Sequence, residues 1–312
     1  MCGIGQIGLA LSLACWRSGY WVWVYGRNAQ KLAKAEQDLG NMDRWMTSEF
    51  PEARPRYGKV KFTSDLAPLN REVDLVVEGI AEDMAVKVAL WHSLRDVASR
   101  GGILCSSTSG LSITGMGRQS GFPAQVIGTH FWNPPHLMPL VEVVAGQGTG
   151  EDTIQTTLEF CRSIGKQPVR VNADVPGFIG NRMLHAMWRE AIEIVGQGIA
   201  SAEDVDMVAK MTFGLRLPVL GPLENMDLVG LDLIRTIHQY LLADLAANRA
   251  PGRLLEELVR ESKLGMKTGE GFYDWSRRNA AAVIEARDRQ IVRELKRHLA
   301  AGGKDPSREN PP

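Results

Sequence analysis

The chain has 312 residues, of which 44% are hydrophobic and 23% are charged. A globular chain of this length usually forms two domains. Its 36 basic and 36 acidic side chains give no net charge and form no long runs, so we expect no nucleic-acid partner. No window reaches the roughly 18 apolar residues that cross a membrane, so we expect no membrane partner.

The first predicted element is a glycine-rich turn, because residues 3–8 read G-I-G-Q-I-G. A helix over 9–17 and a strand over 20–25 are expected to follow it. In this setting the glycines allow a tight turn and a close approach to a pyrophosphate, which binds at the helix N-terminus. We predict a dinucleotide site, against the alternative of a turn without ligand, and its expected contacts are Gly3, Gly5, Gln6, Ile7 and Gly8.

The strand that should lead into this turn is missing, because Met1 stands only two residues before Gly3. In a dinucleotide-binding fold that strand is central and buried. We therefore expect a truncated or mis-started N-terminus, with a short apolar strand encoded upstream. We also expect a sheet in which two strand edges are left unpaired.

The residues after the second strand bear on the cofactor. An acidic residue at this position normally binds the ribose 2′-hydroxyl of NAD. Here Gly26 stands at that position and Arg27 follows it. A guanidinium can pair with the 2′-phosphate of NADP, so this pattern favours NADP, while an Arg27 that is only a solvated turn residue is an equal alternative.

Strands and helices alternate through the next 150 residues. We predict helices over 29–39 and 43–50, strands over 59–62, 73–78 and 103–106, and an amphipathic helix that includes residues 86–97. This alternation predicts a Rossmann-like, doubly wound parallel sheet, whose ligands bind at the carboxyl ends of the strands. Glu82, Ser109 and His130 follow such ends, whereas Ser112 is expected to cap a helix.

Two strand-like runs, 125–131 and 138–144, flank Pro134 and Pro135 and predict a bent hairpin. His130 and Glu142 lie equally far from His136 at its centre. Residues at mirrored positions of a hairpin face each other with Cβ atoms about 5 Å apart. The pair is therefore either a catalytic dyad or a buried structural hydrogen bond.

The alternation of strands and helices gives way to helices alone after a predicted helix over 151–164 and a predicted strand over 167–171. Residues 172–177 are predicted to be a linker, and the segments 178–195, 202–211, 231–247, 254–262 and 281–300 are predicted to be helical. We predict a dinucleotide-binding domain over 1–173 and an all-α domain for substrate binding and dimerisation over 174–300. The polar residues 301–312 are predicted to be a disordered tail.

The chain contains four cysteines, Cys2, Cys15, Cys105 and Cys161, without paired C-x-x-C spacing. This pattern predicts reduced thiols, a cytoplasmic location and no metal site.

Several separated motifs together resemble the L-3-hydroxyacyl-CoA dehydrogenase family over nearly all of residues 3–275. They are the glycine turn, V-V-E-G-I-A-E-D at 76–83, S-S-T-S at 106–109, the hairpin, P-G-F-I-G-N-R at 176–182, G-P-L-E-N-M-D-L-V-G-L-D at 221–232 and K-T-G-E-G-F-Y-D at 267–274. The resemblance implies NAD(P)-dependent oxidation of an L-3-hydroxyacyl-CoA in fatty acid metabolism, or its reverse. It also implies a homodimer that forms through the helical domain.

The resemblance assigns roles to individual residues. It implies that His130 is the general acid/base, that Glu142 orients it, and that Ser109 and Asn181 bind near the substrate oxygen. It further implies that Glu82 and Lys87 line the cofactor site, together with the glycine turn and the Gly26–Arg27 pair. The family usually uses NAD, which stands against the NADP preference predicted from Arg27.

Two alternatives stay open. The N-P-P turn and the S-S-T-S loop also resemble the branch that oxidises free hydroxy acids, such as L-gulonate dehydrogenase and carnitine dehydrogenase. A crystallin-like or sensor protein that binds nucleotide without turnover is the alternative of another class. The intact set of His130, Glu142, Ser109 and Asn181 favours an enzyme.

Overall fold

The structure, a computed structural model, describes residues 1–300, so the tail predicted at 301–312 lies outside the described residues. The chain divides by its internal contacts into two compact units, and the division falls between Arg182 and Met183. Among residues 1–300, no helix is long and apolar enough to cross a membrane. The domain limits predicted from the sequence stay a prediction.

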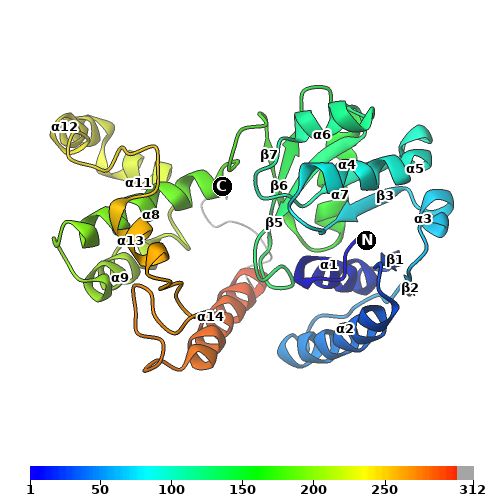
Figure 1. Cartoon of the computed structure of the whole chain (residues 1–312), viewed down its shortest axis with the longest axis horizontal. Helices are drawn as coiled ribbons and strands as arrows, with labels where there is room; N and C mark the ends of the chain where they lie inside the picture. Colours follow the sequence, from blue (N-terminus) through cyan, green and yellow to red (C-terminus); the bar gives the residue numbers. More distant parts are fainter. Residues whose placement is uncertain (301–312) are drawn as a thin grey trace, which may run out of the picture. The chain divides into compact units, whose positions relative to one another are not determined.

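The first unit alternates strands and helices (Figure 1). Its strands are β1 (Trp21–Tyr25), β2 (Lys59–Thr63), β3 (Leu75–Glu78), β4 (Ile103–Ser106), β5 (Val126–Phe131), β6 (Leu140–Ala145) and β7 (Gln167–Val171). Its helices are α1 (Gln6–Arg17), α2 (Ala29–Glu49), α3 (Ala67–Glu72), α4 (Met84–Ser93), α5 (Arg95–Ser99), α6 (Ile113–Ser120) and α7 (Glu151–Ser163). The Rossmann-like fold class is confirmed.

The strands pair in the order β1-β2 and β3-β4-β5-β6-β7. Every pair is parallel except β5 and β6, which form the predicted hairpin. Alternate side chains of β3 point to opposite faces: Val76 belongs to the core with Trp91 of α4, and Val77 to the core with Leu11 of α1 and Leu158 of α7. Both faces are thus covered, which explains why these strands read as continuous apolar runs.

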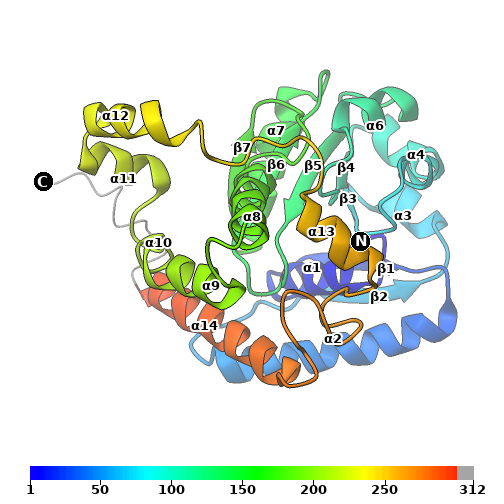
Figure 2. The ribbon, with the colours of Figure 1, turned by 60° about the vertical axis from the view of Figure 1, so that its left-hand side comes forward.

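Two predicted helix boundaries were wrong. The segments 29–39 and 43–50 form the single helix α2, which lies beside α1 (Figures 1 and 2). The polar residues Gly40 and Asn41 do not interrupt it, because its Leu32, Ala35 and Leu39 supply a buried stripe. The helix predicted over 86–97 is divided at Leu94 into α4 and α5.

A single residue occupies the centre of the sheet. Cys2 forms one parallel bridge to Tyr25 of β1 and another to Glu78 of β3. The Cys2 N–H donates to the carbonyl of Val77 at 2.8 Å, and the Tyr25 N–H donates to the carbonyl of Met1 at 2.8 Å. The two facing strand edges expected from the sequence are therefore joined, but only at this one place.

A cavity of about 330 Å³ lies beside this bridge, and we call it the β1–β3 slot. Its lining includes Trp21 and Trp23 from β1, Asp74 just before β3, and Leu75 of β3 itself. Beyond Cys2 the facing edges of β1 and β3 border this cavity.

The second unit is helical. Helix α8 (Gly180–Gly196) leads into it, and α9 (Ala202–Met211), α10 (Phe213–Arg216), α11 (Pro222–Val229), α12 (Leu231–Leu241), α13 (Arg253–Arg260) and α14 (Ala280–Ala300) follow. Helices α10 and α11 were not predicted, and the helix predicted over 231–247 ends at Leu241. Helices α8 to α13 contain no buried residue, and Leu223, Leu228 and Leu231 are at least 60% exposed.

Candidate active site

The hairpin of β5 and β6 brings an imidazole and a carboxylate together. The antiparallel register places His130 opposite Glu142, which confirms that these residues face each other. Nδ1 of His130 lies 2.7 Å from Oε2 of Glu142. The two residues are only 5% and 1% exposed. This geometry fits both of the predicted interpretations, so the surroundings must distinguish them.

The second oxygen of Glu142 holds the start of α8. Oε1 accepts hydrogen bonds from the backbone N–H groups of Ile179 at 2.8 Å and Gly180 at 3.0 Å. Burial alone would raise the pKa of Glu142, but the hydrogen bonds from His130, Gly180 and Ile179 outweigh it and lower the pKa below its usual value. Glu142 is therefore a carboxylate at neutral pH, placed at a helix N-terminus where negative charge is favoured.

Trp132 and Gly180 form a tight contact that the sequence did not reveal. The ring of Trp132 lies 5.2 Å from the His130 ring, measured between centroids. A Cβ atom added to Gly180 would lie 2.2 Å from Cζ2 of Trp132. Residue 180 must therefore be glycine for the indole to rest beside the imidazole, because real Cβ contacts are never this short.

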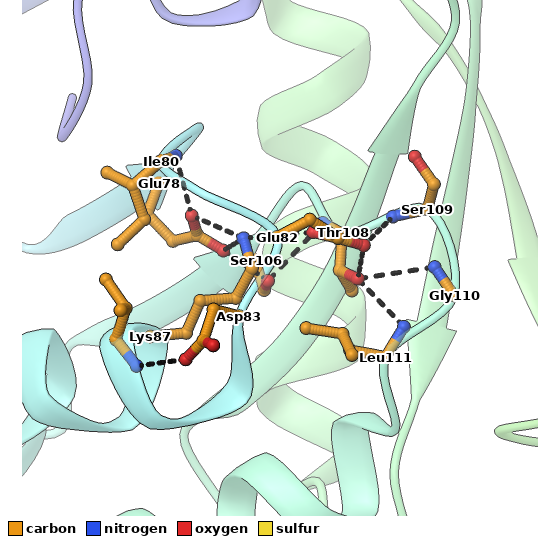
Figure 3. A network of polar contacts seen from close by, with 11 residues as sticks. Glu78, Ile80, Glu82, Asp83, Lys87, Ser106, Thr108, Ser109, Gly110 and Leu111 are labelled. Carbon is orange, nitrogen blue, oxygen red and sulfur yellow. Dashed lines mark hydrogen bonds and ion pairs between the residues drawn. The ribbon is translucent and has the colours of Figure 1, made fainter.

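Ser109 and Asn181 come together through the backbone. Nδ2 of Asn181 donates to the carbonyl oxygen of Ser109 at 3.3 Å, and the Ser109 N–H donates to Oε1 of Glu82 at 3.0 Å. Figure 3 shows the hydroxyl end of Ser109 directed away from this network. Since Asn181 directly follows Gly180, the peptide held by Glu142 connects the hairpin to the loop that carries Ser109.

A second buried acid–base pair lies at the ends of β3 and β4 (Figure 3). Nζ of Lys87 donates to both oxygens of Glu78, at 2.7 and 2.8 Å, and the two side chains are 1% and 0% exposed. Ser106 donates a further hydrogen bond to Glu78. Burial raises the pKa of Glu78, although Lys87, Ser106 and the N–H of Ile80 counteract this rise. Sequence reasoning missed Glu78 because it read as the end of a strand.

The predicted cofactor residues Lys87 and Glu82 differ in accessibility. Nζ of Lys87 also lies 3.4 Å from Oε2 of Glu82, whose side chain is 48% exposed. Glu82 is therefore open to a ligand, whereas the ammonium of Lys87 lies behind it between two carboxylates. The hydroxyls of the loop that follows β4 form hydrogen bonds within that loop. Ser112 accepts the Gly115 N–H at 3.0 Å, which confirms its role as a helix cap.

The glycine turn is shaped for a close backbone approach. Gly3 has a φ of +113°, and a Cβ there would lie 2.6 Å from the carbonyl oxygen of Gly79. A Cβ on Gly8 would lie 2.1 Å from the carbonyl oxygen of Gly3, while one on Gly5 would meet nothing within 4 Å. Gly5 also stands as the N-cap of α1 without any side-chain cap. The turn thus leaves open space at a helix N-terminus, which fits a pyrophosphate.

Gly26 has little room for a larger side chain, whereas Arg27 is exposed. A Cβ on Gly26 would lie 3.1 Å from side-chain carbons of Ile4 and Leu32, so an acidic residue there requires a shift of neighbours. Arg27 is exposed, and Asn28 accepts the Lys31 N–H as the cap of α2. The exposed guanidinium is free of the packing that restricts Gly26.

Comparison with known families matches both parts of the chain. Residues 1–175 match the NAD-binding domain of 3-hydroxyacyl-CoA dehydrogenase, and residues 177–275 match its C-terminal domain. A 5-formyl-3-hydroxy-2-methylpyridine 4-carboxylate 5-dehydrogenase of Mesorhizobium japonicum is 31% identical over 93% of this chain and 94% of the relative. A probable 3-hydroxybutyryl-CoA dehydrogenase of Deinococcus radiodurans is 37% identical over 88% of this chain and 98% of the relative.

Solved structures agree with these matches. A crystal structure of a 5-formyl-3-hydroxy-2-methylpyridine 4-carboxylic acid 5-dehydrogenase, an NAD⁺-dependent dismutase, is similar with a TM-score of 0.88 and 31% identity over 96% of this chain and 97% of that chain. The (S)-3-hydroxybutyryl-CoA dehydrogenase of Ralstonia eutropha is similar with a TM-score of 0.70 and 29% identity over 88% of this chain and 97% of that chain.

Proposed function

Because the chain belongs to the 3-hydroxyacyl-CoA dehydrogenase family of oxidoreductases, which act on CH–OH groups with NAD, we propose that it oxidises an L-3-hydroxyacyl-CoA to the 3-oxoacyl-CoA, or catalyses the reverse. The observation that carries this proposal is the 2.7 Å contact of His130 Nδ1 with a charged Glu142. The contact leaves the second ring nitrogen of His130 for the substrate, and the match to a dehydrogenase family supports a dyad over a structural pair.

The proton steps follow from this contact. The neighbouring carboxylate fixes the Nδ1–H tautomer of neutral His130, so Nε2 carries a lone pair. In the oxidising direction Nε2 accepts the proton of the substrate hydroxyl, and Glu142 stabilises the imidazolium that forms. In the reducing direction Nε2 returns the proton to the carbonyl oxygen. Ser109 and Asn181 are proposed to hold that oxygen, which keeps it aligned with His130.

The cofactor site is proposed to consist of the glycine turn, the Gly26–Arg27 pair and the exposed side of Glu82. Bound NAD supplies the hydride acceptor at its nicotinamide. The pyrophosphate is proposed to bind at the backbone of Gly3, Gly5 and Gly8. A Cβ atom does not fit at Gly3 or Gly8, and the space around Gly5 is open. Lys87 supports this site from behind by holding Glu82 in place.

A free hydroxy acid is the second candidate substrate. The TM-score of 0.88 to an enzyme that acts on a free pyridine carboxylic acid exceeds the 0.70 found for a CoA-ester enzyme. This favours a carboxylate-bearing substrate without CoA, as in the L-gulonate and carnitine branch. The family relationship supports turnover, against the crystallin-like or sensor alternative.

Steady-state assays distinguish these candidates. Acetoacetyl-CoA reduction with NADH should give a kcat/KM at least about 100-fold above that for free 3-oxo acids if the CoA ester is the substrate. The opposite ratio would establish the free acid. No turnover with either class, while NADH still binds, would contradict both and favour a protein without turnover.

We also propose an NADP preference, carried by exposed Arg27 and the missing acidic residue at Gly26. The family habit and the NAD⁺-dependent relative support NAD instead. Dissociation constants for NADH and NADPH, measured by fluorescence titration, decide between the two.

A homodimer through the second unit is proposed on its exposed apolar surface. Leu228 and Leu231 are 74% and 60% exposed, and the nearby Leu223 is 70% exposed. Apolar patches of this kind usually mark an interface. Sedimentation of the protein should give a dimer, and Leu228→Glu should shift it to monomer. The cytoplasmic location stays a prediction, which the four free, buried cysteines support.

A further inference from the structure

Lys166 is a buried cation outside the proposed dyad. It stands between α7 and β7 and is only 8% exposed. Its Nζ donates to the carbonyl oxygen of Pro135 at 2.6 Å and to that of Met138 at 2.9 Å. Both carbonyls belong to the turn that joins β5 to β6. A long side chain thus reaches from one part of the sheet to the tip of the hairpin that carries His130 and Glu142.

The turn has a compact structure that these bonds complete. Its backbone closes on itself, because the N–H groups of Leu137 and Met138 both donate to the carbonyl of Pro134, at 3.0 and 2.9 Å. The N–H of Gln167, the residue after Lys166, donates to Pro139 at 2.8 Å. The start of β7 therefore holds the turn by a backbone hydrogen bond, and Lys166 adds one hydrogen bond on each side of the tip.

Two titratable groups act on the charge of Lys166, and they are the thiols of Cys161 on α7 and Cys15 on α1. Burial raises the pKa of each thiol to about 12, so both are neutral under ordinary conditions. Burial also lowers the pKa of Lys166 to about 8. A cation kept here is costly, and the two carbonyls are the groups that compensate for it.

We propose that Lys166 is a positioning residue, which fixes the β5–β6 turn and thereby keeps the imidazole of His130 aligned with Glu142 and the substrate. The proposal rests on the function proposed above for that dyad. The turn leaves β5 just after His130 and enters β6 just before Glu142. Greater mobility of the turn would therefore change the positions of these two side chains relative to each other. A misplacement of about 1 Å at a reacting group costs roughly 100-fold in rate.

Lys166→Met tests the proposal, because methionine keeps an unbranched apolar stem but donates no hydrogen bond. Arg170→Met is the matched control: it removes a cation from β7 whose partner, Glu151, is exposed. We expect Lys166→Met to lower kcat by about 10- to 100-fold while the NADH dissociation constant stays within about twofold. Arg170→Met should change neither. All assays are run well below the melting temperature of each variant.

The pH profile supplies a readout that a merely structural role would not change. A neutral amine donates weaker hydrogen bonds than an ammonium, so the kcat of the wild type should fall as pH rises through about 8. Lys166→Met should lack this limb. An unchanged kcat in the variant, with only a lower melting temperature, would overturn the proposal, as would an identical pH profile.

A spectroscopic test separates this proposal from the proposed function. The ring signals of His130 are identified in nitrogen-15 NMR spectra by their loss in His130→Ala. In Lys166→Met they should shift or broaden, as should those of His136 in the turn itself, while those of the histidines outside the hairpin stay in place. This result does not need turnover, so it holds even if no substrate is found. Unchanged His130 signals would refute the positioning role, whatever the enzyme's substrate.

Discussion

Two buried carboxylates on one sheet behave differently because their partners differ. Glu78 at the end of β3 pairs with Lys87, and burial raises its pKa. Glu142 in β6 pairs with His130, and its hydrogen bonds lower its pKa. Both are essentially inaccessible, with exposed fractions of 0% and 1%. Burial alone therefore does not tell a structural pair from a functional one.

The difference lies in what each partner has left to offer. The ammonium of Lys87 is directed at two carboxylates, so the pair is closed on itself. The imidazole of His130 uses one nitrogen for Glu142 and is proposed to offer the other to a substrate. Glu142 in turn uses its second oxygen to hold the start of α8. A pair that leaves a titratable atom free can carry out proton transfer, and a closed pair can only hold its surroundings.

Replacing His130 by alanine should produce the largest effect. We expect kcat to fall by about 10³- to 10⁴-fold, because proton transfer to a positioned base is lost. The NADH dissociation constant should stay close to that of the wild type, since the glycine turn is separate from the hairpin. Steady-state kinetics and fluorescence titration check the two halves. Retained turnover would show that His130 does not transfer the substrate proton, so that its pair with Glu142 is structural like the pair of Lys87 and Glu78.

Breaking the closed pair should cost stability first. Lys87→Met leaves Glu78 buried without its cation, which should lower the free energy of unfolding by about 3–5 kcal/mol in urea denaturation. The double variant Glu78→Met/Lys87→Met removes both charges and should recover most of this loss. If the double variant is as unstable as the single one, the penalty comes from packing and not from the unpaired carboxylate.

Glu142→Gln changes the open pair without changing its shape. The amide oxygen can still accept from Ile179 and Gly180, so the amide NH₂ must face Nδ1 of His130. That nitrogen then has to accept, the proton moves to Nε2, and the base is lost. We expect kcat to fall by about 100-fold with little change in NADH binding. Equal activity of the two proteins would argue that Glu142 does not select the tautomer.

The pH dependence of stability should also distinguish the pairs. Glu142 has a lowered pKa when folded, so its contribution is present above about pH 4.5 and is lost as pH falls through the folded value. Glu142→Gln should therefore lose less stability on acidification than the wild type. Glu78 has a raised pKa and the opposite sign, so Glu78→Gln should lose more stability on acidification than the wild type. Acid unfolding curves of the two variants compare these slopes directly.

Arg27 carries an exposed charge, and its replacement is expected to have the smallest effect. If NADPH binds tighter than NADH, Arg27→Ala should weaken NADPH binding by about tenfold and leave NADH unchanged, since one charge-assisted hydrogen bond is lost. Gly26→Asp should reverse the preference less cleanly, because its Cβ presses on Ile4 and Leu32 at 3.1 Å. Tighter NADH binding in the wild type would make Arg27 a solvated turn residue.

Local patterns predicted much of the fold and of the hairpin. The mirrored spacing around His136 placed His130 opposite Glu142 in the correct register, because a two-residue period fixes which side chains face each other. The motif Ser106–Ser109 correctly marked the end of β4. In contrast, α2 read as two helices, since the burial that joins them is a property of packing and not of local sequence.

The contacts that the sequence did not reveal are those between distant segments. Nothing near Gly180 indicates that Trp132, far back in the chain, occupies the space of its missing side chain. Lys166 directly precedes β7 and is buried against Pro135 and Met138, which nothing in its local sequence indicates. Such contacts depend on how the hairpin meets α8 and the start of β7, which a pattern of residue types does not encode.

The two bridges formed by Cys2 should affect how the sheet opens locally. Backbone hydrogen bonds connect β1 to β3 only through residues 1–3 in the described chain, and the β1–β3 slot lies beyond them. The segment that contains β1 and β2 should therefore exchange its amide hydrogens by a sub-global opening that leaves the five-stranded part closed. Gly3 belongs both to this junction and to the proposed dinucleotide site. Binding of the dinucleotide should slow amide hydrogen exchange in β1 and β2 more than in β4. The cofactor would then stabilise the boundary between β1 and β3 against local opening.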